Sequence, residues 1–262
     1  STSPRLAQEV RAVRNIALIA RRELGQYFTS PIAYLVAFAI LMLTGFQFNT
    51  DLASRVGQRP PDGTAVLAAF GFLTIFFAPL LTMRLFAEEW REGTLELLLT
   101  APVRDGDITL GKFLGAWLYY TFILGLTLTY QIIWLSITSA RSYQIAPELD
   151  IGPVISGYLG IWLFGGAALA VGLLFSALTE NQVIAGFLSI SALFILWLGD
   201  FAGSVIQNRP VAEVVRSLSL QSHYSTSFLI GVIRFEDVVF FIGLIVAVIF
   251  ITTRLIESRR WR

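Results

Sequence analysis

The sequence predicts an all-α integral membrane protein with six transmembrane helices, and three observations support this fold class. The 262 residues are 55% hydrophobic and only 14% charged, with a mean hydropathy of +0.70, whereas soluble domains carry about 25% charged residues. Several apolar runs approach or exceed the roughly 20 residues that a helix needs to cross a bilayer. Lysine and arginine also gather in alternate connections between these runs. Lipid is therefore the expected solvent for much of the surface.

The predicted spans follow the apolar runs of the chain. They cover Ile32–Phe48, Ala65–Ala87, Ile108–Ile137, Val154–Leu178, Val183–Phe201 and Val238–Ile256. The third is long enough to extend out of the bilayer. Only Thr179 to Gln182 separates the fourth span from the fifth, so these two should form an antiparallel hairpin. The chain thus divides into residues 1–31 and a six-span domain at 32–262.

Residues 1–31 predict an amphipathic helix that does not span the membrane. Its apolar positions recur mostly every three or four residues with arginines between them: Leu6, Val10, Val13, Ile16, Ile19 and Leu24. A helix this charged should lie on the inner membrane surface, and the alternative is a soluble helix packed on another protein. Ser30-Pro31 should end it. Five arginines and no long apolar run argue against a cleavable signal peptide here.

The distribution of basic residues predicts the orientation. With the N-terminus in the cytoplasm, the inner segments hold roughly twice as many lysines and arginines as the outer segments. We therefore expect a multi-pass protein of the cell inner (plasma) membrane with both termini cytoplasmic and an even number of spans.

The longest outer connection covers residues 202–237 and is not polar throughout. Its scattered apolar residues predict short helices that dip into the outer leaflet without crossing it. A seventh span here would place the C-terminus outside, against the arginines that it carries.

The inner connection between the second and third spans, residues 88–107, has its own local construction. The second span should run into the charged stretch Glu88–Glu92 and end at Gly93. Thr94 is a good N-cap for a new short helix, and Glu96 would lie near the positive end of that helix. Pro102 should stop it.

That short helix would carry four leucines in five positions, which are Leu95, Leu97, Leu98 and Leu99. They cannot share one helical face, so some should contact a partner outside the local hairpin. The alternative is packing under the N-terminal helix. Asp105 or Asp107 should then cap the third span.

These segments resemble a known family. Residues 88–103 read E-E-x-R-E-G-T-L-E-L-L-L-T-A-P-V, and with Gly111-Lys112 they resemble the coupling-helix region of ABC-2 type transporter permeases. Arg22-Glu23-Leu24 and Tyr27–Pro31 resemble the entry signature of that family. Gly231–Asp237 is similar to the branch that contains gliding-motility and copper-enzyme-maturation permeases. The resemblance covers essentially the whole chain.

The resemblance implies a permease subunit of an ATP-binding cassette transporter, an exporter with a type V-like fold and a short cytoplasmic coupling helix. Two permease subunits, identical or different, would form the pathway. Two separate ATPase subunits would bind ATP and Mg²⁺ and drive alternating access. The residues implied to contact the ATPase are Glu88, Glu89, Arg91, Glu92, Thr94, Leu95, Glu96, Leu97, Leu98, Leu99 and Glu180. The chain has no phosphate-binding loop, so we expect it to be no enzyme and to hold no cofactor itself.

Few polar residues lie within the predicted spans. Thr44, Gln47 and Gln131 are the main candidates for a substrate pathway. No chain of carboxylates suggests ion coupling, which weakens a secondary-transporter interpretation. Glycines between 157 and 172 permit close helix approach, either for movement at a subunit interface or for static packing. A pathway this apolar favours a lipid or another amphipathic substrate.

Composition excludes several other classes. The chain has no cysteine, so disulfides and thiolate sites are excluded, and its single histidine, His223, excludes a metal site built from several histidines. A net charge of +1 argues against nucleic-acid binding. The alternatives left are a membrane scaffold of a motility or secretion complex that docks an ATPase without moving a solute, an intramembrane enzyme, and a channel.

Overall fold

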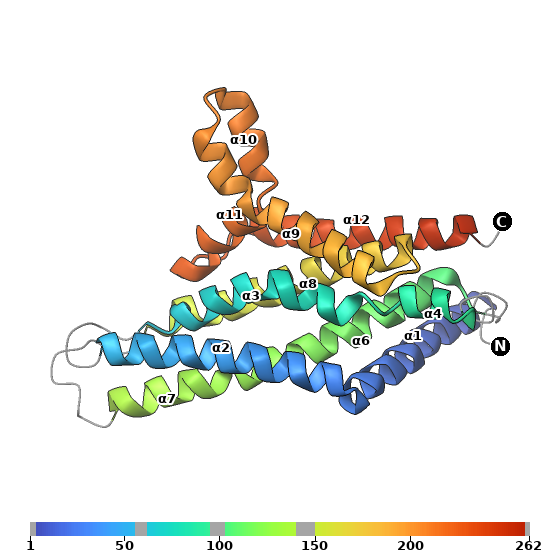
Figure 1. Ribbon diagram of the computed structural model, residues 1–262, viewed down its shortest axis with the longest axis horizontal. Coiled ribbons are helices and arrows are strands. Elements are labelled where there is room, and N and C mark those ends of the chain that lie inside the picture. The colour runs from blue at the N-terminus through green and yellow to red at the C-terminus, as the bar shows by residue number, and fades with distance from the viewer. Residues whose placement is uncertain (1–3, 56–61, 95–102, 140–149, 260–262) are drawn as a thin grey trace.

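The computed structural model describes residues 4–55, 62–94, 103–139 and 150–259, and every regular element in these ranges is a helix (Figure 1). Within them, six helical segments are long and apolar enough to cross a membrane. They are α2 (Pro31–Arg55), α3 with α4 (Thr64–Thr82 and Ala87–Arg91), α6 with α7 (Asp105–Leu126 and Leu128–Ser139), α8 (Ile151–Leu178), α9 (Gln182–Val205) and α12 (Phe235–Arg259). The predicted all-helical, six-span layout is thereby confirmed.

The second span is interrupted, where we expected one helix to Ala87. α3 ends at Thr82, shortly after the internal Pro79, and α4 begins at Ala87. The hydroxyl of Ser176 on α8 donates a hydrogen bond to the Met83 carbonyl at 2.9 Å. It accepts hydrogen bonds from the amides of Phe86 and Ala87 at 3.0 and 3.2 Å. One buried hydroxyl thus replaces helical bonds that are lost at the break.

Two other predicted helix ends differ in detail. The third span is divided at Thr127, whose hydroxyl donates to the Leu124 carbonyl at 2.6 Å and lies 2.9 Å from the Tyr158 hydroxyl. α6 begins at Asp105, so Arg104 is its N-cap residue and makes no side-chain cap bond. The prediction that Asp105 or Asp107 caps this helix is wrong. Both lie in its first turn, where a carboxylate favours the positive end of the helix dipole.

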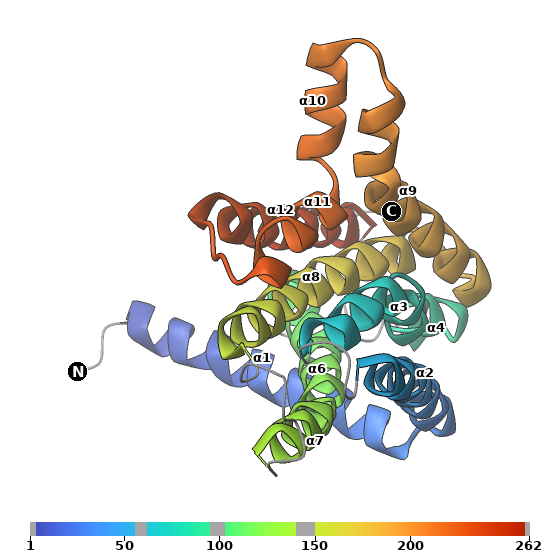
Figure 2. The ribbon, with the colours of Figure 1, turned by 90° about the vertical axis from the view of Figure 1, so that its left-hand side faces the viewer.

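α8 is the central helix of the bundle. In its most apolar window 78% of the residues are buried, against 28–56% in the other spans, and α3, α6, α9 and α12 pack around it (Figure 2). Its glycines receive side chains from these neighbours: Gly157 faces Leu67, and Gly165 faces Tyr120. Of the two roles considered for these small residues, the structure supports close packing within the chain.

The N-terminal helix α1 (Pro4–Thr29) lies across one end of the bundle, in a direction different from that of the spans (Figure 2). It packs mainly against α6. A Cβ added at Gly111 would lie 2.6 Å from the Cβ of Ile19, and one at Gly115 would lie 2.6 Å from the Cβ of Glu23. These two glycines let α1 cross α6 closely. The predicted break at Ser30-Pro31 is present, and the membrane-surface position of α1 stays a prediction.

The connection after α9 contains short helices, as predicted. They are α10 (Arg209–Ser217), α11 (Leu220–Ser225) and the 3₁₀ turn η1 (Phe228–Ile230). α10 packs on Gly199 and Gly203 of α9, and this pair projects sideways from the bundle (Figure 1). α11 folds back, since Nδ1 of His223 lies 2.6 Å from an Asp237 oxygen of α12. Whether these helices enter the outer leaflet stays a prediction.

Candidate functional site

The segments that the sequence analysis placed on the cytoplasmic side lie together at one end of the molecule. α1, α4, the start of α6, the α8–α9 connection and the end of α12 lie together there (Figure 1). α4 contacts both α8 and α9, so the two segments that the resemblance assigned to ATPase contact share one end of the bundle. Glu180 is exposed on the α8–α9 connection.

The inner connection begins as the sequence predicts. Glu92 is the C-cap of α4, and Gly93 follows with a φ of +69°, a conformation that favours glycine. The Thr94 hydroxyl donates to the Glu89 carbonyl at 3.3 Å. The expected contact residues Leu95, Glu96, Leu97, Leu98 and Leu99 lie outside the described residues, and the short helix stays a prediction.

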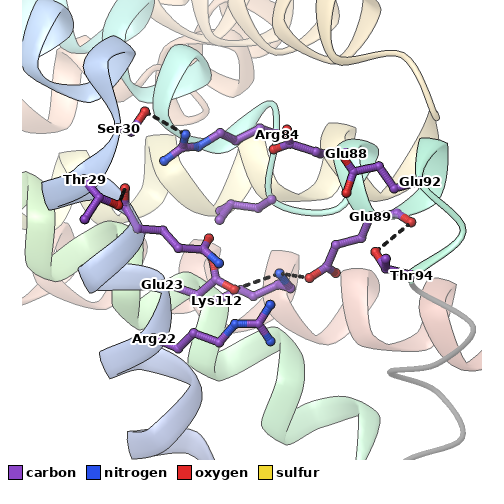
Figure 3. Close-up of a pocket in the computed structure, with 12 residues that line it drawn as sticks. Arg22, Glu23, Thr29, Ser30, Arg84, Glu88, Glu89, Glu92, Thr94 and Lys112 are labelled. Atoms are coloured by element: carbon purple, nitrogen blue, oxygen red, sulfur yellow. Dashed lines mark hydrogen bonds and ion pairs between the residues drawn. The ribbon is translucent and has the colours of Figure 1, made fainter.

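A buried lysine joins three helices beside this connection. Nζ of Lys112, on α6, donates to Oε1 of Glu23 on α1 at 3.0 Å and to Oε1 of Glu89 on α4 at 2.7 Å (Figure 3). Lys112 is 2% exposed and Glu23 4%. Its ammonium group also lies 5.4 Å from the centre of the Phe86 ring. We call these three residues the Lys112 cluster.

Sequence reasoning named Glu89 but not its two partners. Glu23 and Lys112 were part of the motifs that carry the family resemblance, but neither was assigned a role of its own. A signal existed, because Lys112 stands between Leu110 and Phe113 in an otherwise apolar run. A charge at such a position is costly unless it is paired.

A second set of contacts fixes the α1–α2 corner to the end of α3. Arg84 donates to the Ser30 hydroxyl at 2.9 Å, and its guanidinium lies 4.9 Å from the centre of the Tyr27 ring. The Tyr27 hydroxyl donates to the Leu81 carbonyl at 2.7 Å, and its ring stacks on Tyr119. Burial raises the pKa of Tyr27 well above its ordinary value, so this hydroxyl keeps its proton. Arg84 therefore has partners on α1 and at the start of the α1–α2 corner.

The Lys112 cluster forms one wall of a cavity of about 620 Å³ (Figure 3). The rest of its charged lining consists of Arg22, Arg84, Glu88 and Glu92, and Thr94 stands at its edge. Four of the predicted contact residues, Glu88, Glu89, Glu92 and Thr94, therefore lie around one hollow. Arg91 is exposed and outside it.

The three predicted pathway residues are placed separately. Thr44 is buried and its hydroxyl donates to Ile40 of its own helix at 2.7 Å. Gln47 is exposed. Gln131 donates to the Gly63 carbonyl at 2.8 Å. None of them lines the cavity beside Lys112, and their role in transport stays a prediction.

Six apolar helical segments with a charged cluster at one end define a multi-pass membrane protein. Residues 13–255 match the sequence model of a protein family that is described as ABC-2 family transporter protein. The chain belongs to this family, which confirms the resemblance found in the inner connection.

One relative is described as probable ABC transporter permease protein NosY of Pseudomonas aeruginosa. The two are 31% identical over 166 residues, which is 61% of this chain and 56% of that protein. The similarity thus spans little more than half the length of the relative.

Proposed function

We propose that this chain is the permease subunit of an ATP-binding cassette exporter in the inner membrane, with both termini in the cytoplasm. Two separate cytoplasmic ATPase subunits bind ATP and Mg²⁺ and dock against residues 88–107 and Glu180. A second permease subunit completes the pathway. Movement of the docked ATPases alternates access to that pathway, and net transport requires that substrate affinity differ between the two states. The apolar spans favour an amphipathic substrate.

The observation that carries this proposal is the Lys112 cluster. α4 forms the start of the coupling region at residues 88–107, and α6 begins at its end. Lys112 holds Glu89 of α4 and Glu23 of α1 within 3.0 Å. A displacement of the coupling region therefore moves α1, α4 and α6 as one body, instead of bending a loose loop. This is the mechanical property that a subunit driven from outside the membrane requires.

Docking is tested by co-purification of this chain with its partner ATPase. Leu97→Asp and Leu98→Asp should each abolish co-purification and the stimulation of ATP hydrolysis, because a carboxylate cannot enter an apolar groove without a large desolvation cost. Leu218→Asp is the matched control, since Leu218 is 56% exposed and follows α10, away from the end that holds α4. Retention of the ATPase by both variants would refute the docking role.

Alternating access is tested by the rate at which a thiol in the pathway is labelled with and without ATP. In a scaffold that moves no solute, ATP should leave this rate unchanged. The chain has no cysteine, so Gln131→Cys provides a single reactive thiol in a predicted pathway position. Its rate of reaction with a maleimide should change when ATP is added to the reconstituted complex. Equal rates with and without ATP would favour the scaffold alternative.

A further inference from the structure

A second hollow, of about 400 Å³, opens between α1 and the start of α6. Its polar lining consists of Arg11, Arg14 and Asn15 of α1 and of Arg104 and Asp107 beside the coupling region. Three guanidinium groups thus face one carboxylate. This excess of positive charge distinguishes the hollow from the cavity beside Lys112, where carboxylates outnumber cations.

The three arginines are available to a ligand. All three are exposed, and among the described residues none of them belongs to an ion pair. Like charges that gather around one hollow repel each other, and a bound anion removes that repulsion. The planar guanidinium donates two parallel hydrogen bonds to phosphate oxygens, a geometry that matches phosphate better than a point charge does. The hollow therefore suits a phosphate group.

The surroundings indicate where that phosphate comes from. α1 also exposes Val13 and Leu18, at 68% and 58%, beside the exposed Arg14. A helix that presents apolar residues next to arginines fits the membrane interface, where the former contact acyl chains and the latter contact headgroups. α1 lies across the end of the spans (Figure 2), as an interfacial helix does. An acidic protein surface would match the arginines but not the apolar neighbours.

We propose that this hollow binds the phosphate of an anionic phospholipid headgroup. Arg11, Arg14 and Arg104 donate to the phosphate oxygens, and the Asn15 amide adds a neutral donor. One lipid molecule then joins α1 to the residues where the coupling region enters α6. The site requires α1 to lie at the membrane surface but requires no ATPase, so it can hold or fail independently of the transport function.

The test uses the full chain purified in detergent and titrated with phosphatidylglycerol or phosphatidylcholine, with bound lipids counted by native mass spectrometry. The wild-type chain should bind phosphatidylglycerol at least about tenfold more tightly than phosphatidylcholine. Both lipids carry the phosphate, but phosphatidylcholine adds a quaternary ammonium group that the three arginines repel. R11Q, R14Q and R104Q should each weaken binding of phosphatidylglycerol, and the triple variant should abolish the preference. R21Q is the matched control, because Arg21 is exposed on the same helix and lines neither cavity.

Several results would overturn the assignment. An equal loss in R21Q and R14Q would reduce it to general attraction between α1 and anionic lipid. Displacement of phosphatidylglycerol by an equal concentration of inorganic phosphate would make the hollow a site for free phosphate. Loss of ATPase co-purification in R104Q, with lipid binding unchanged, would assign the hollow to the partner protein.

Discussion

Lys112 is the residue whose replacement should cost most, because its charge is buried between two carboxylates. Lys112→Met leaves Glu23 and Glu89 facing each other without a cation, and breaking a buried ion pair from one side costs about 3–5 kcal/mol. The melting temperature of the purified chain should fall, and stimulation of the partner ATPase should fall with it. Lys112→Arg retains the charge and should recover part of both. An unchanged melting temperature in Lys112→Met would contradict the burial that the structure assigns to this ammonium group.

Ser176 has a comparable role at the break between α3 and α4. Ser176→Ala removes one donor and one acceptor from buried backbone groups, at a cost of about 1–3 kcal/mol, and should loosen α4. Ser189→Ala is the matched control. Ser189 is equally buried, but its hydroxyl bonds only to the Ala185 carbonyl of its own helix. Chemical unfolding should give a lower free energy of unfolding for Ser176→Ala than for Ser189→Ala. Equal free energies would show that the Ser176 hydroxyl does not stabilise the turn between α3 and α4.

The site could be predicted from the sequence only where its residues are close in the chain. Glu88, Glu89 and Glu92 were named because residues 88–103 resemble a known family, and their contact with an ATPase stays a prediction. Glu23 lies 89 residues from Lys112, and periodicity within α1 does not specify which helix it crosses or at what register. The pairing depends on that crossing, so it became visible only in the folded chain.

At the scale of helices, the crossing of α1 over α6 depends on two glycines. Gly115→Ala places a methyl group 2.6 Å from the Glu23 Cβ and 3.1 Å from the Ala20 carbonyl, and overpacking of this kind costs about 1–3 kcal/mol. α1 should therefore be cleaved faster by trypsin, which has several arginines to attack there. Gly125→Ala on the same helix is the control, since its added methyl group meets nothing within 4 Å. Similar cleavage of the two variants would mean that α1 is not held by close contact.

The limits of helix prediction also have physical causes. Apolar runs and the signals at Ser30-Pro31 and Gly93 predict helices and their ends, because backbone chemistry is local. The interruption after Thr82 was missed because the group that stabilises it, the Ser176 hydroxyl, comes from another helix. The N-cap at Arg104 was missed for a different reason: a carboxylate in the first turn favours the helix dipole without being the cap.

For the whole molecule, the number of spans was predictable because each run must satisfy its own backbone hydrogen bonds in lipid. The central place of α8 has a weaker sequence signal, which is apolar character on all sides and many glycines. The sequence does not specify which neighbouring helix packs against each of those glycines, because that depends on how the helices are arranged in the folded bundle. The sideways projection of α9 with α10 likewise depends on contacts at Gly199 and Gly203, and the composition of residues 202–237 does not specify it.

Orientation is the property of the whole molecule on which ATPase docking depends. Because the chain lacks cysteine, one exposed thiol can be introduced at a time by Arg91→Cys, Glu180→Cys or Leu218→Cys. The first two positions lie at the end that holds α4, and the third is the C-cap of α10. Basic residues are retained on the cytoplasmic side. A membrane-impermeant maleimide should therefore label Leu218→Cys in intact spheroplasts, and the other two only after permeabilisation. The reverse pattern would place residues 88–107 outside the cell, where no cytoplasmic ATPase could reach them.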